Sequence, residues 1–443
     1  MNIQLTDCGR GQTLYRKAKS LMPGGTQLLS KRPEMFLPEF WPAYYDRAKG
    51  AEIWDLNGNR YVDMSYCGIG STVLGYADPD VDDAVRGAIG RGTMCTLNSP
   101  EEVDLVELML DLHPWAHKVR LARCGGESMA IAVRIARAFT NRDRIAFCGY
   151  HGWHDWYLSA NLQEEGALND HLLSGLEPAG VPHGLLESAL PFHYNKLDEL
   201  KAIVSKHRNE IAAIVMEPLR GQKPEPGFLE GVREIATEIG AVLIFDEVTS
   251  GFRVCNGGVH LTLGTLPDIA VFAKALGNGY PMSAVIGKED VMDAAQRSFI
   301  SSTFWTERIG PVAAIATIQK FRAQNVSQHL IDIGQQVKII WQNAAKQAGL
   351  AIHVSGIDPL GHFSFTGTEA QVAKTVFTQL MLERSFLATT SFYAMYAHNT
   401  NHVQAYASAV TEAFDIISDA LQSGSIKSLL KGPVAHTGFA RIA

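Results

Sequence analysis

Two charged residues, Asp246 and Lys274, each follow a short apolar run, and their types suggest a particular chemistry. Residues 242–245 are apolar and partly β-branched, which is typical of a buried parallel strand, and residues 269–273 form a second such run. Open α/β sheets bind their ligands beyond the carboxyl ends of such strands. A lysine that forms a Schiff base and a carboxylate that faces a ring nitrogen suit pyridoxal 5′-phosphate (PLP). The pair therefore predicts a PLP site; a helix-capping aspartate and a solvated lysine are the ordinary alternatives.

A pair of glycines, Gly125 and Gly126, stands between a predicted strand at residues 119–122 and a predicted helix from Glu127. Free amides and the positive end of a helix bind anions at such a junction, and glycine lets the backbone approach a phosphate closely. A tight turn without any ligand has the same sequence pattern. The two glycines are therefore candidate phosphate-binding residues.

The segment GYHGWHDW, residues 149–156, follows another predicted strand. The ring of Tyr150 can stack on a planar cofactor. His151 and His154 are three residues apart and Asp155 is adjacent, a spacing that suits a metal site, but no third ligand stands at a convincing spacing. Because aromatic packing is the commoner use of such a segment, the sequence predicts no metal.

From about residue 119, predicted strands alternate with amphipathic helices, which indicates βαβ units and a mostly parallel sheet. The sequence before this region predicts a helix over residues 12–21 and a hairpin over residues 50–64, with a two-residue turn at Asn57-Gly58. After about residue 311 the pattern changes to long helices and a shorter α+β tail. The predicted divisions of the chain are residues 1–65, 66–320 and 321–443.

The composition of the chain limits the classes of protein to which it can belong. The chain has 443 residues, 46% of them hydrophobic, and a net charge of −7, so a large soluble core is expected and nucleic acid is a poor partner. The first 21 residues lack the apolar segment of a signal peptide, and no apolar run is long enough to span a membrane. Six cysteines occur without a CxxC pair, which is typical of reduced and mostly buried thiols. We therefore expect a cytoplasmic protein.

Six motifs, in their order along the chain, resemble those of the class III aminotransferases, which are PLP enzymes of fold type I. They are RCGGES, YHGWH, IVMEPL, FDEVTSGFR, KALGNGYP and SSTFW. The turn PGG at residues 23–25 and the predicted hairpin are similar to the branch that contains glutamate-1-semialdehyde aminomutase. The resemblance covers nearly the whole chain. It implies an α/β fold whose large domain has a mostly parallel seven-stranded sheet between helices, and a small α+β domain built from both termini.

The resemblance assigns catalysis to two residues. Lys274 would form the Schiff base with PLP and then carry the proton between the substrate carbon and the cofactor. Asp246 would pair with the nitrogen of the cofactor ring. Val248 would pack against one face of the ring and Tyr150 against the other.

Further cofactor-binding residues follow from the same motifs. Gly125 and Gly126 would bind the phosphate through backbone N–H groups. Thr303 resembles a threonine that reaches the phosphate of the neighbouring subunit, which implies a homodimer with active sites at the interface. His151 belongs to the tyrosine loop, and Glu217 matches a glutamate near the cofactor whose role is either catalytic or structural.

The sequence departs from the family pattern mostly on the substrate side. Gly126 replaces the usual threonine, so one hydroxyl donor to the phosphate is missing. A lysine or arginine stands near the position where the aminomutase branch has an arginine that holds the substrate carboxylate. Glu307 and Arg308 follow the phosphate threonine in place of the usual SGNP. The candidate substrate residues are Lys31, Arg32, Trp153, Trp305 and Tyr393.

These features predict a transaminase that moves an amino group from an amino acid, expected to be L-glutamate, to an aldehyde or keto acceptor. The aromatic and polar replacements suit a bulky hydroxylated acceptor, and the family suggests an oxidised sugar such as an 8-oxo derivative of the octulosonate Kdo, aminated for lipopolysaccharide. Intramolecular transfer, as in the aminomutases, and a non-catalytic protein of the same fold are the alternatives. The altered carboxylate region disfavours intramolecular transfer, and the presence of Lys274 and Asp246 disfavours a non-catalytic protein.

Overall fold

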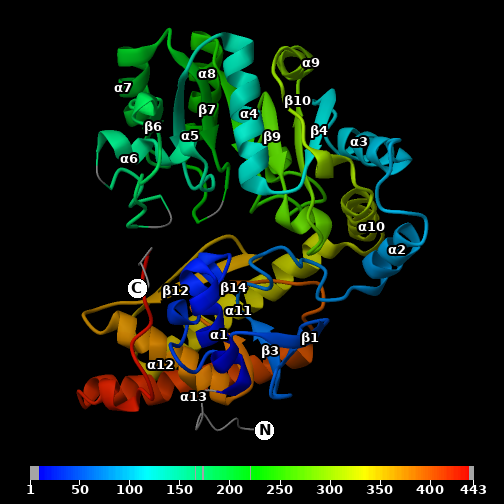
Figure 1. The fold of residues 1–443 in the computed structure, drawn as a ribbon. Coiled ribbons are helices and arrows are strands. Elements are labelled where there is room, and N and C mark those ends of the chain that lie inside the picture. The colour runs from blue at the N-terminus through cyan, green and yellow to red at the C-terminus, as the bar shows by residue number, and fades with distance from the viewer. Residues whose placement is uncertain (1–8, 165, 172–173, 220, 439–443) are drawn as a thin grey trace. The chain divides into compact units, whose positions relative to one another are not determined.

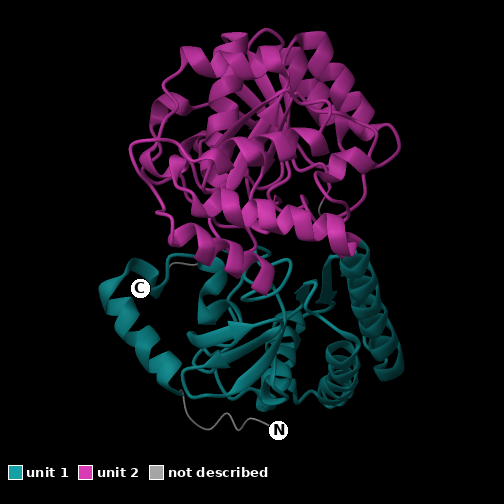
Figure 2. Ribbon diagram, turned by 90° about the vertical axis from the view of Figure 1, so that its right-hand side faces the viewer, with its two compact units in different colours: residues 1–78, 328–443 teal, residues 79–327 magenta. Residues whose placement is uncertain are grey.

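The computed structural model describes residues 9–164, 166–171, 174–219 and 221–438, and Figure 1 labels its elements. The chain divides into two compact units, residues 79–327 and residues 1–78 together with 328–443 (Figure 2). We call them the central unit and the terminal unit. The boundaries lie after residues 78 and 327, whereas the sequence predicted divisions after residues 65 and 320.

The central unit is built on a seven-stranded sheet in the order β4-β10-β9-β8-β7-β5-β6. β10 runs antiparallel to both of its neighbours, and the other neighbouring strands are parallel. The strands are β4 (Lys118–Ala122), β5 (Arg144–Cys148), β6 (Ala189–Pro191), β7 (Ile211–Met216), β8 (Val242–Asp246), β9 (Ile269–Phe272) and β10 (Ser283–Gly287). The predicted α/β fold with a mostly parallel seven-stranded sheet is confirmed.

Both faces of this sheet are buried under helices. Successive residues of β8 point to opposite sides, so Val242 and Ile244 join the core beneath α4 while Leu243 and Phe245 join the core beneath α7 and α8. This double burial explains why the strands are continuous apolar runs instead of alternating ones. The helices are α2 (Pro79–Ile89), α3 (Pro100–Leu112), α4 (Gly125–Thr140), α5 (Asp155–Leu158), α6 (Ala160–Gln163), α7 (Leu197–His207), α8 (Phe228–Ile239), α9 (Glu289–Asp293) and α10 (Ile309–Gln324) (Figure 1).

The terminal unit joins the two ends of the chain in one small α+β fold. Its first sheet has the order β1-β2-β3-β13, in which β13 from the C-terminal part pairs in parallel with β3 from the N-terminal part. Its second sheet has the order β11-β12-β14. The strands are β1 (Tyr45–Lys49), β2 (Glu52–Asp55), β3 (Arg60–Met64), β11 (Ile352–Ser355), β12 (Leu360–Phe365), β13 (Phe386–Ala388) and β14 (Ser391–Tyr393). The helices are α1 (Gly9–Leu21), α12 (Ala370–Glu383) and α13 (Thr400–Gln422), and α11 (Val326–Ala348) leads into the unit.

Two local predictions need correction. The hairpin β2–β3 is present, but its connection is a four-residue loop, residues 56–59, and not the predicted two-residue turn. The loop forms because the Asp55 carboxylate accepts hydrogen bonds from the amides of Asn57 and Asn59, at 2.8 and 2.9 Å. The prediction of mostly buried thiols is also wrong for the described cysteines: all five are free, but only Cys67 and Cys148 are buried. Cys8 lies outside the described residues.

Candidate active site

Asp246 and Lys274 lie at the carboxyl ends of neighbouring strands in the central unit. Asp246 ends β8 and pairs with Val271 of β9, and Lys274 stands two residues beyond the end of β9. Parallel pairing therefore brings both side chains to the same edge of the sheet. Lys274 has a φ of 46°, a left-handed conformation that a lysine seldom adopts. Such backbone conformations cluster at functional sites, where the surrounding structure maintains them.

His151 holds the carboxylate of Asp246. The Nδ1 atom of His151 lies 2.8 Å from Oδ2 of Asp246, and both side chains are buried. The other ring nitrogen, Nε2, lies 3.1 Å from the carbonyl oxygen of Cys148, and the amide of Val248 donates to Oδ1 of Asp246 at 3.0 Å. His151 therefore acts on Asp246, and its contacts leave it no role as a metal ligand.

The Nζ atom of Lys274 donates a hydrogen bond to the hydroxyl of Thr249, at 2.9 Å. Thr249 is buried, and its carbonyl oxygen accepts a hydrogen bond of 2.6 Å from Nε of the buried Arg253. Sequence reasoning did not include Thr249 among the site residues. A hydroxyl three residues after the strand-end Asp246 is the signal that could have identified it.

A buried polar network anchors the loop that carries Thr249. The carboxylate of Glu247 accepts hydrogen bonds from the hydroxyl of Ser250 at 2.6 Å, from the amide of Val259 at 3.0 Å, and from the amide and Nδ1 of His260 at 2.9 and 2.7 Å. Nε2 of His260 in turn accepts from the indole N–H of Trp115, at 2.9 Å. Because all these groups are paired, Glu247 fixes the loop behind Asp246 and has no free oxygen directed to a substrate.

Gly125 and Gly126 are the first two residues of α4, which begins two residues earlier than predicted. Their amides have no carbonyl four residues earlier in the helix to bind, so they remain available to an anion. A Cβ on Gly125 would lie 2.8 Å from Cγ1 of Val248, and one on Gly126 would lie 3.1 Å from Nδ1 of His154. The imidazole of His154 therefore fills the space that a threonine side chain at position 126 would need.

Tyr150 and Glu217 come together at the ends of β5 and β7. The amide of Tyr150 donates to Oε2 of Glu217 at 3.3 Å, and Gly149, with a φ of 110°, lets the backbone pass close to this carboxylate. Tyr150 packs edge-on against Tyr157 with ring centroids 5.9 Å apart. Glu217 therefore positions the tyrosine loop, which favours the structural role over the catalytic one.

The remaining predicted residues of the central unit lie around the start of α4 and of α10. Trp153 is exposed and stacks on His154 with centroids 4.4 Å apart. Thr303 begins the short 3-10 helix Thr303–Thr306 and has an exposed side chain, whereas Trp305 is half-buried against the core. None of the three shares a described contact with Asp246.

Three candidate substrate residues belong to the terminal unit. Lys31 is exposed, whereas Arg32 is half-buried and its guanidinium lies against the PGG turn at Gly24. Of these two, Arg32 is therefore the one with a defined position beside this turn. Tyr393 ends β14 and meets Tyr66 edge-on at 5.5 Å.

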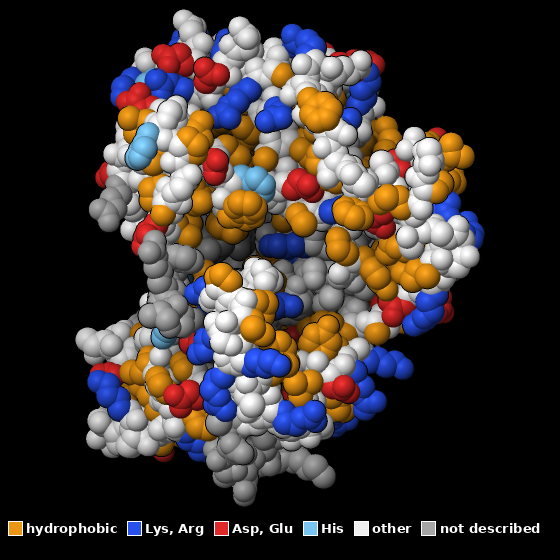
Figure 3. Space-filling model, in the orientation of Figure 1, with side chains coloured by type: hydrophobic (Ala, Val, Ile, Leu, Met, Phe, Trp, Pro, Cys, Tyr) orange, Lys and Arg blue, Asp and Glu red, His pale blue; other side chains and the backbone are white. Residues whose placement is uncertain are grey.

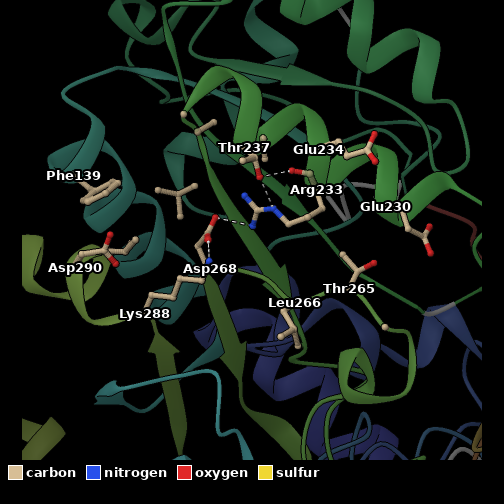
Figure 4. A pocket seen from close by; sticks show the side chains of 16 residues that line it. Phe139, Glu230, Arg233, Glu234, Thr237, Thr265, Leu266, Asp268, Lys288 and Asp290 are labelled. Carbon is tan, nitrogen blue, oxygen red and sulfur yellow. Dashed lines mark hydrogen bonds and ion pairs between the residues drawn. The ribbon is translucent and has the colours of Figure 1, made fainter.

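A groove of about 670 Å³ lies at the opposite end of the same sheet, near the amino-terminal ends of β8 and β9 (Figure 4). Three of its charged side chains pair with one another: Asp268 accepts from Arg233 at 2.9 Å and from Lys288 at 2.7 Å, and it also accepts from the amide of Leu243 at 2.8 Å. This groove is therefore separate from the edge that carries Asp246 and Lys274.

The residues at the carboxyl edge fit PLP. Each oxygen of Asp246 accepts one described hydrogen bond and keeps a lone pair for the N–H of a protonated ring nitrogen. The glycine amides at the start of α4 suit a phosphate, and the Lys274 amine suits an aldehyde. Among the described residues, no three side chains of His, Cys, Asp or Glu come together as metal ligands.

This fold and site define a PLP-dependent transaminase of fold type I. The chain belongs to the class III aminotransferases, because residues 38–390 match the family model described as Aminotransferase class-III. It is 32% identical over 417 residues to 3-aminobutyryl-CoA aminotransferase of Cloacimonas acidaminovorans (strain Evry), an alignment that covers 91% of this chain and 96% of the relative.

Two solved structures are also similar. FumI of Sphingopyxis sp. MTA144, in its PLP internal aldimine form, is 25% identical with a TM-score of 0.85, covering 94% of this chain and 98% of that one. An omega-transaminase from Sphaerobacter thermophilus is 26% identical with a TM-score of 0.82, covering 92% and 98%. PLP is therefore the cofactor, as the sequence predicted.

The contact between Lys274 and Thr249 gives a first prediction. Replacing Thr249 with valine removes the hydroxyl at nearly constant volume, and we expect proton transfer with an amino acid donor to slow by about tenfold or more, since hydrogen bonds to charged groups contribute about 1.5–3 kcal/mol. Stopped-flow absorbance with the α-deuterated donor should show a larger isotope effect than in the wild type. T249S, which keeps the hydroxyl, is the control; equal isotope effects in T249V and the wild type would contradict this role.

Proposed function

We propose that this protein transfers an amino group from L-glutamate to an aldehyde or keto acceptor in two half-reactions. The observation that supports this most directly is the joint position of Lys274 and Asp246, each held by a second side chain, Thr249 and His151. Loss of either Lys274 or Asp246 would instead have favoured a non-catalytic protein of the same fold.

Each residue has a distinct task in this proposal. PLP supplies an electron sink when it is bound. Asp246, held by His151, keeps the ring nitrogen protonated, and Lys274 moves the proton at the substrate carbon. Gly125 and Gly126 bind the phosphate through their amides, and the remaining contacts to the ring come from Tyr150 and Val248.

The acceptor is proposed to be a carbonyl compound larger than the common keto acids. The relative that acts on 3-aminobutyryl-CoA supports a 3-oxoacyl thioester. The aromatic residues Trp153, Trp305 and Tyr393 support the oxidised sugar expected from the sequence. Glu307 is engaged with the start of α10, so one group expected to face a hydroxylated substrate is not free to do so.

Intramolecular amino transfer is the second candidate, and Arg32 beside the PGG turn favours it, since an arginine there would hold a substrate carboxylate. An aminomutase needs no external donor. A transaminase, by contrast, must exchange its amino group with glutamate before it meets the acceptor.

Absorbance spectra of the PLP-loaded protein, before and after addition of L-glutamate alone, test the proposal. We expect glutamate to convert the band of the lysine-bound cofactor to that of pyridoxamine phosphate. D-glutamate and K274A are the controls, and neither should give the change. A band that L-glutamate leaves untouched would contradict the assignment of this donor, and conversion by 3-aminobutyryl-CoA instead would identify the amine that the enzyme uses.

A homodimer is part of the proposal. Phe299 and Phe304 flank Thr303 and are 88% and 67% exposed, and such large exposed apolar side chains commonly mark an interface. The central unit, which carries α4 and β9, shows many hydrophobic side chains at its surface in Figure 3. Sedimentation and activity are measured at the same protein concentration. A monomer that is fully active at that concentration would contradict an interface contact by Thr303.

A cytoplasmic location is proposed as well. The exposed thiols of Cys95 and Cys124 are unpaired, which suits a reducing compartment. No helix in the described part of the chain is long and apolar enough to cross a membrane.

A further inference from the structure

Arg123 joins two segments of the central unit that are far apart in the sequence. Its Nη2 donates to the carbonyl oxygens of Trp305 at 3.0 Å and Glu307 at 2.8 Å. Its Nε lies 2.9 Å from Oε1 of Glu307, an ion pair in which the N–H is not aligned with the oxygen. The side chains of Arg123 and Glu307 are only 10% and 19% exposed, so solvent screens this pair weakly.

Each partner also organises its own segment. The carboxylate of Glu307 accepts from the amides of Ile309 at 2.6 Å and Gly310 at 2.8 Å, which caps the start of α10. On the other side, the amide of Arg123 donates to Oε2 of Glu127 at 3.1 Å. We call residues 123–127 the phosphate turn and residues 303–307 the Thr303 segment.

In the proposed function, both segments contact a phosphate of the cofactor. The phosphate turn holds Gly125 and Gly126, and the Thr303 segment holds the threonine expected to reach the phosphate of a neighbouring subunit. The Thr303 segment departs from the family pattern at Glu307, which stands in place of the usual SGNP. The structure shows that this departure pairs with Arg123, the first residue of the phosphate turn.

We propose that Arg123 and Glu307 are positioning residues that hold the phosphate turn and the Thr303 segment in the geometry needed to bind the phosphate of PLP. This inference rests on the proposed function of the same site. Neither side chain needs to touch the cofactor. Arg123 acts through the backbone of both segments, and Glu307 acts through Arg123 and the start of α10.

A second ion pair at the start of α10 provides a matched control. Nε of Arg308 lies 3.0 Å from Oε2 of Glu101, and these side chains are 17% and 10% exposed, nearly the values of Arg123 and Glu307. This pair ties α10 to α3 and makes no contact with the phosphate turn among the described residues. The two pairs have similar burial, and Glu101 also pairs with Arg91 at 3.0 Å, so E101Q removes a counterion from two arginines without removing a contact of the cofactor segments.

The experiment measures the dissociation constant of PLP for resolved apoprotein, by absorbance titration, in E307Q and E101Q. We expect E307Q to weaken PLP binding by about tenfold or more, because loss of one partner leaves the buried Arg123 charge without its counterion. E101Q should change the constant by less than about twofold, although it lowers the unfolding temperature at least as much as E307Q does. R123K, which keeps the charge but loses the planar fork, gives a second test should E307Q fold poorly.

A double-mutant cycle with T303A separates positioning from general destabilisation. If Glu307 acts by placing Thr303, T303A should weaken PLP binding in the wild type and have little further effect in E307Q. T303A and E101Q should be additive. Equal dissociation constants for E307Q and E101Q, or additive effects of E307Q and T303A, would overturn this inference and leave the proposed function standing. Wild-type apoprotein that takes up no PLP would overturn both the inference and the proposed function.

Discussion

Replacing Lys274 with alanine is expected to abolish covalent attachment of PLP and to lower turnover by about 10²–10⁴-fold or more, the range that a positioned acid–base group contributes. The alanine removes the amine that the Thr249 hydroxyl holds at 2.9 Å, at a backbone conformation that the turn after β9 imposes on this position. Lys274 is only half-buried and lies at the edge of the sheet, outside its apolar core, so K274A should remain folded.

Mass spectrometry after borohydride reduction measures the attachment directly. The wild-type peptide that contains Lys274 should gain the mass of the reduced cofactor, and the corresponding K274A peptide should not. Lys288 offers a matched control, because it lies at the opposite end of the sheet and pairs with Asp268 at 2.7 Å. K288A should keep the label and the turnover. Covalent label and turnover in K274A would show that another lysine carries the cofactor.

The parts of the fold that the sequence predicted are those with strong local signals. β8 and β9 are fully buried runs of apolar residues; β8 ends at Asp246, and Lys274 follows β9 by two residues. α4 begins at a glycine pair. The strands, their ends and the phosphate turn could therefore be predicted from short stretches of sequence. The order of these elements then indicated a mostly parallel sheet, since each βαβ unit brings its strand ends to the same edge.

Among the elements of the central unit that were not predicted, three have a clear physical reason. β6 (Ala189–Pro191) has only three residues and ends in a proline, so it lacks a periodic pattern. α7 (Leu197–His207) follows Lys196, which gives no side-chain cap to mark its start. β10 (Ser283–Gly287) is antiparallel to its neighbours. An antiparallel strand needs no crossover helix, so the alternation of strands and helices gave no signal for it.

The side-chain partners in the site were less predictable than the site itself. His151 meets Asp246 across 95 positions of sequence, and Arg123 meets Glu307 across 184. Such contacts depend on how the sheet edge brings loops together, and no local pattern encodes them. The residue types gave candidates, and the tertiary structure determined which of them pair.

Replacing Asp246 with asparagine is the second change with a large expected effect, because it keeps the shape of the side chain and removes its charge. A neutral amide cannot keep the ring nitrogen protonated. We expect the rate of the half-reaction with L-glutamate to fall by about 10²–10³-fold, the cost of removing one preorganised electrostatic contact in an active site. Covalent attachment of PLP at Lys274 should persist, so D246N and K274A should differ in the labelling experiment while both lose activity.

The contact between His151 and Asp246 provides a further test of this prediction. The N–H₂ of an asparagine at position 246 can donate to Nδ1 of His151, while Nε2–H of the same ring donates to the carbonyl oxygen of Cys148. D246N should therefore keep a hydrogen bond to His151 and a normal fold, which separates loss of charge from loss of structure. H151Q, which retains Asp246 and can still donate to it, should slow the half-reaction much less than D246N. Stopped-flow absorbance of the PLP-loaded proteins with L-glutamate measures both rates, and a D246N rate equal to that of the wild type would show that Asp246 does not control the ring nitrogen.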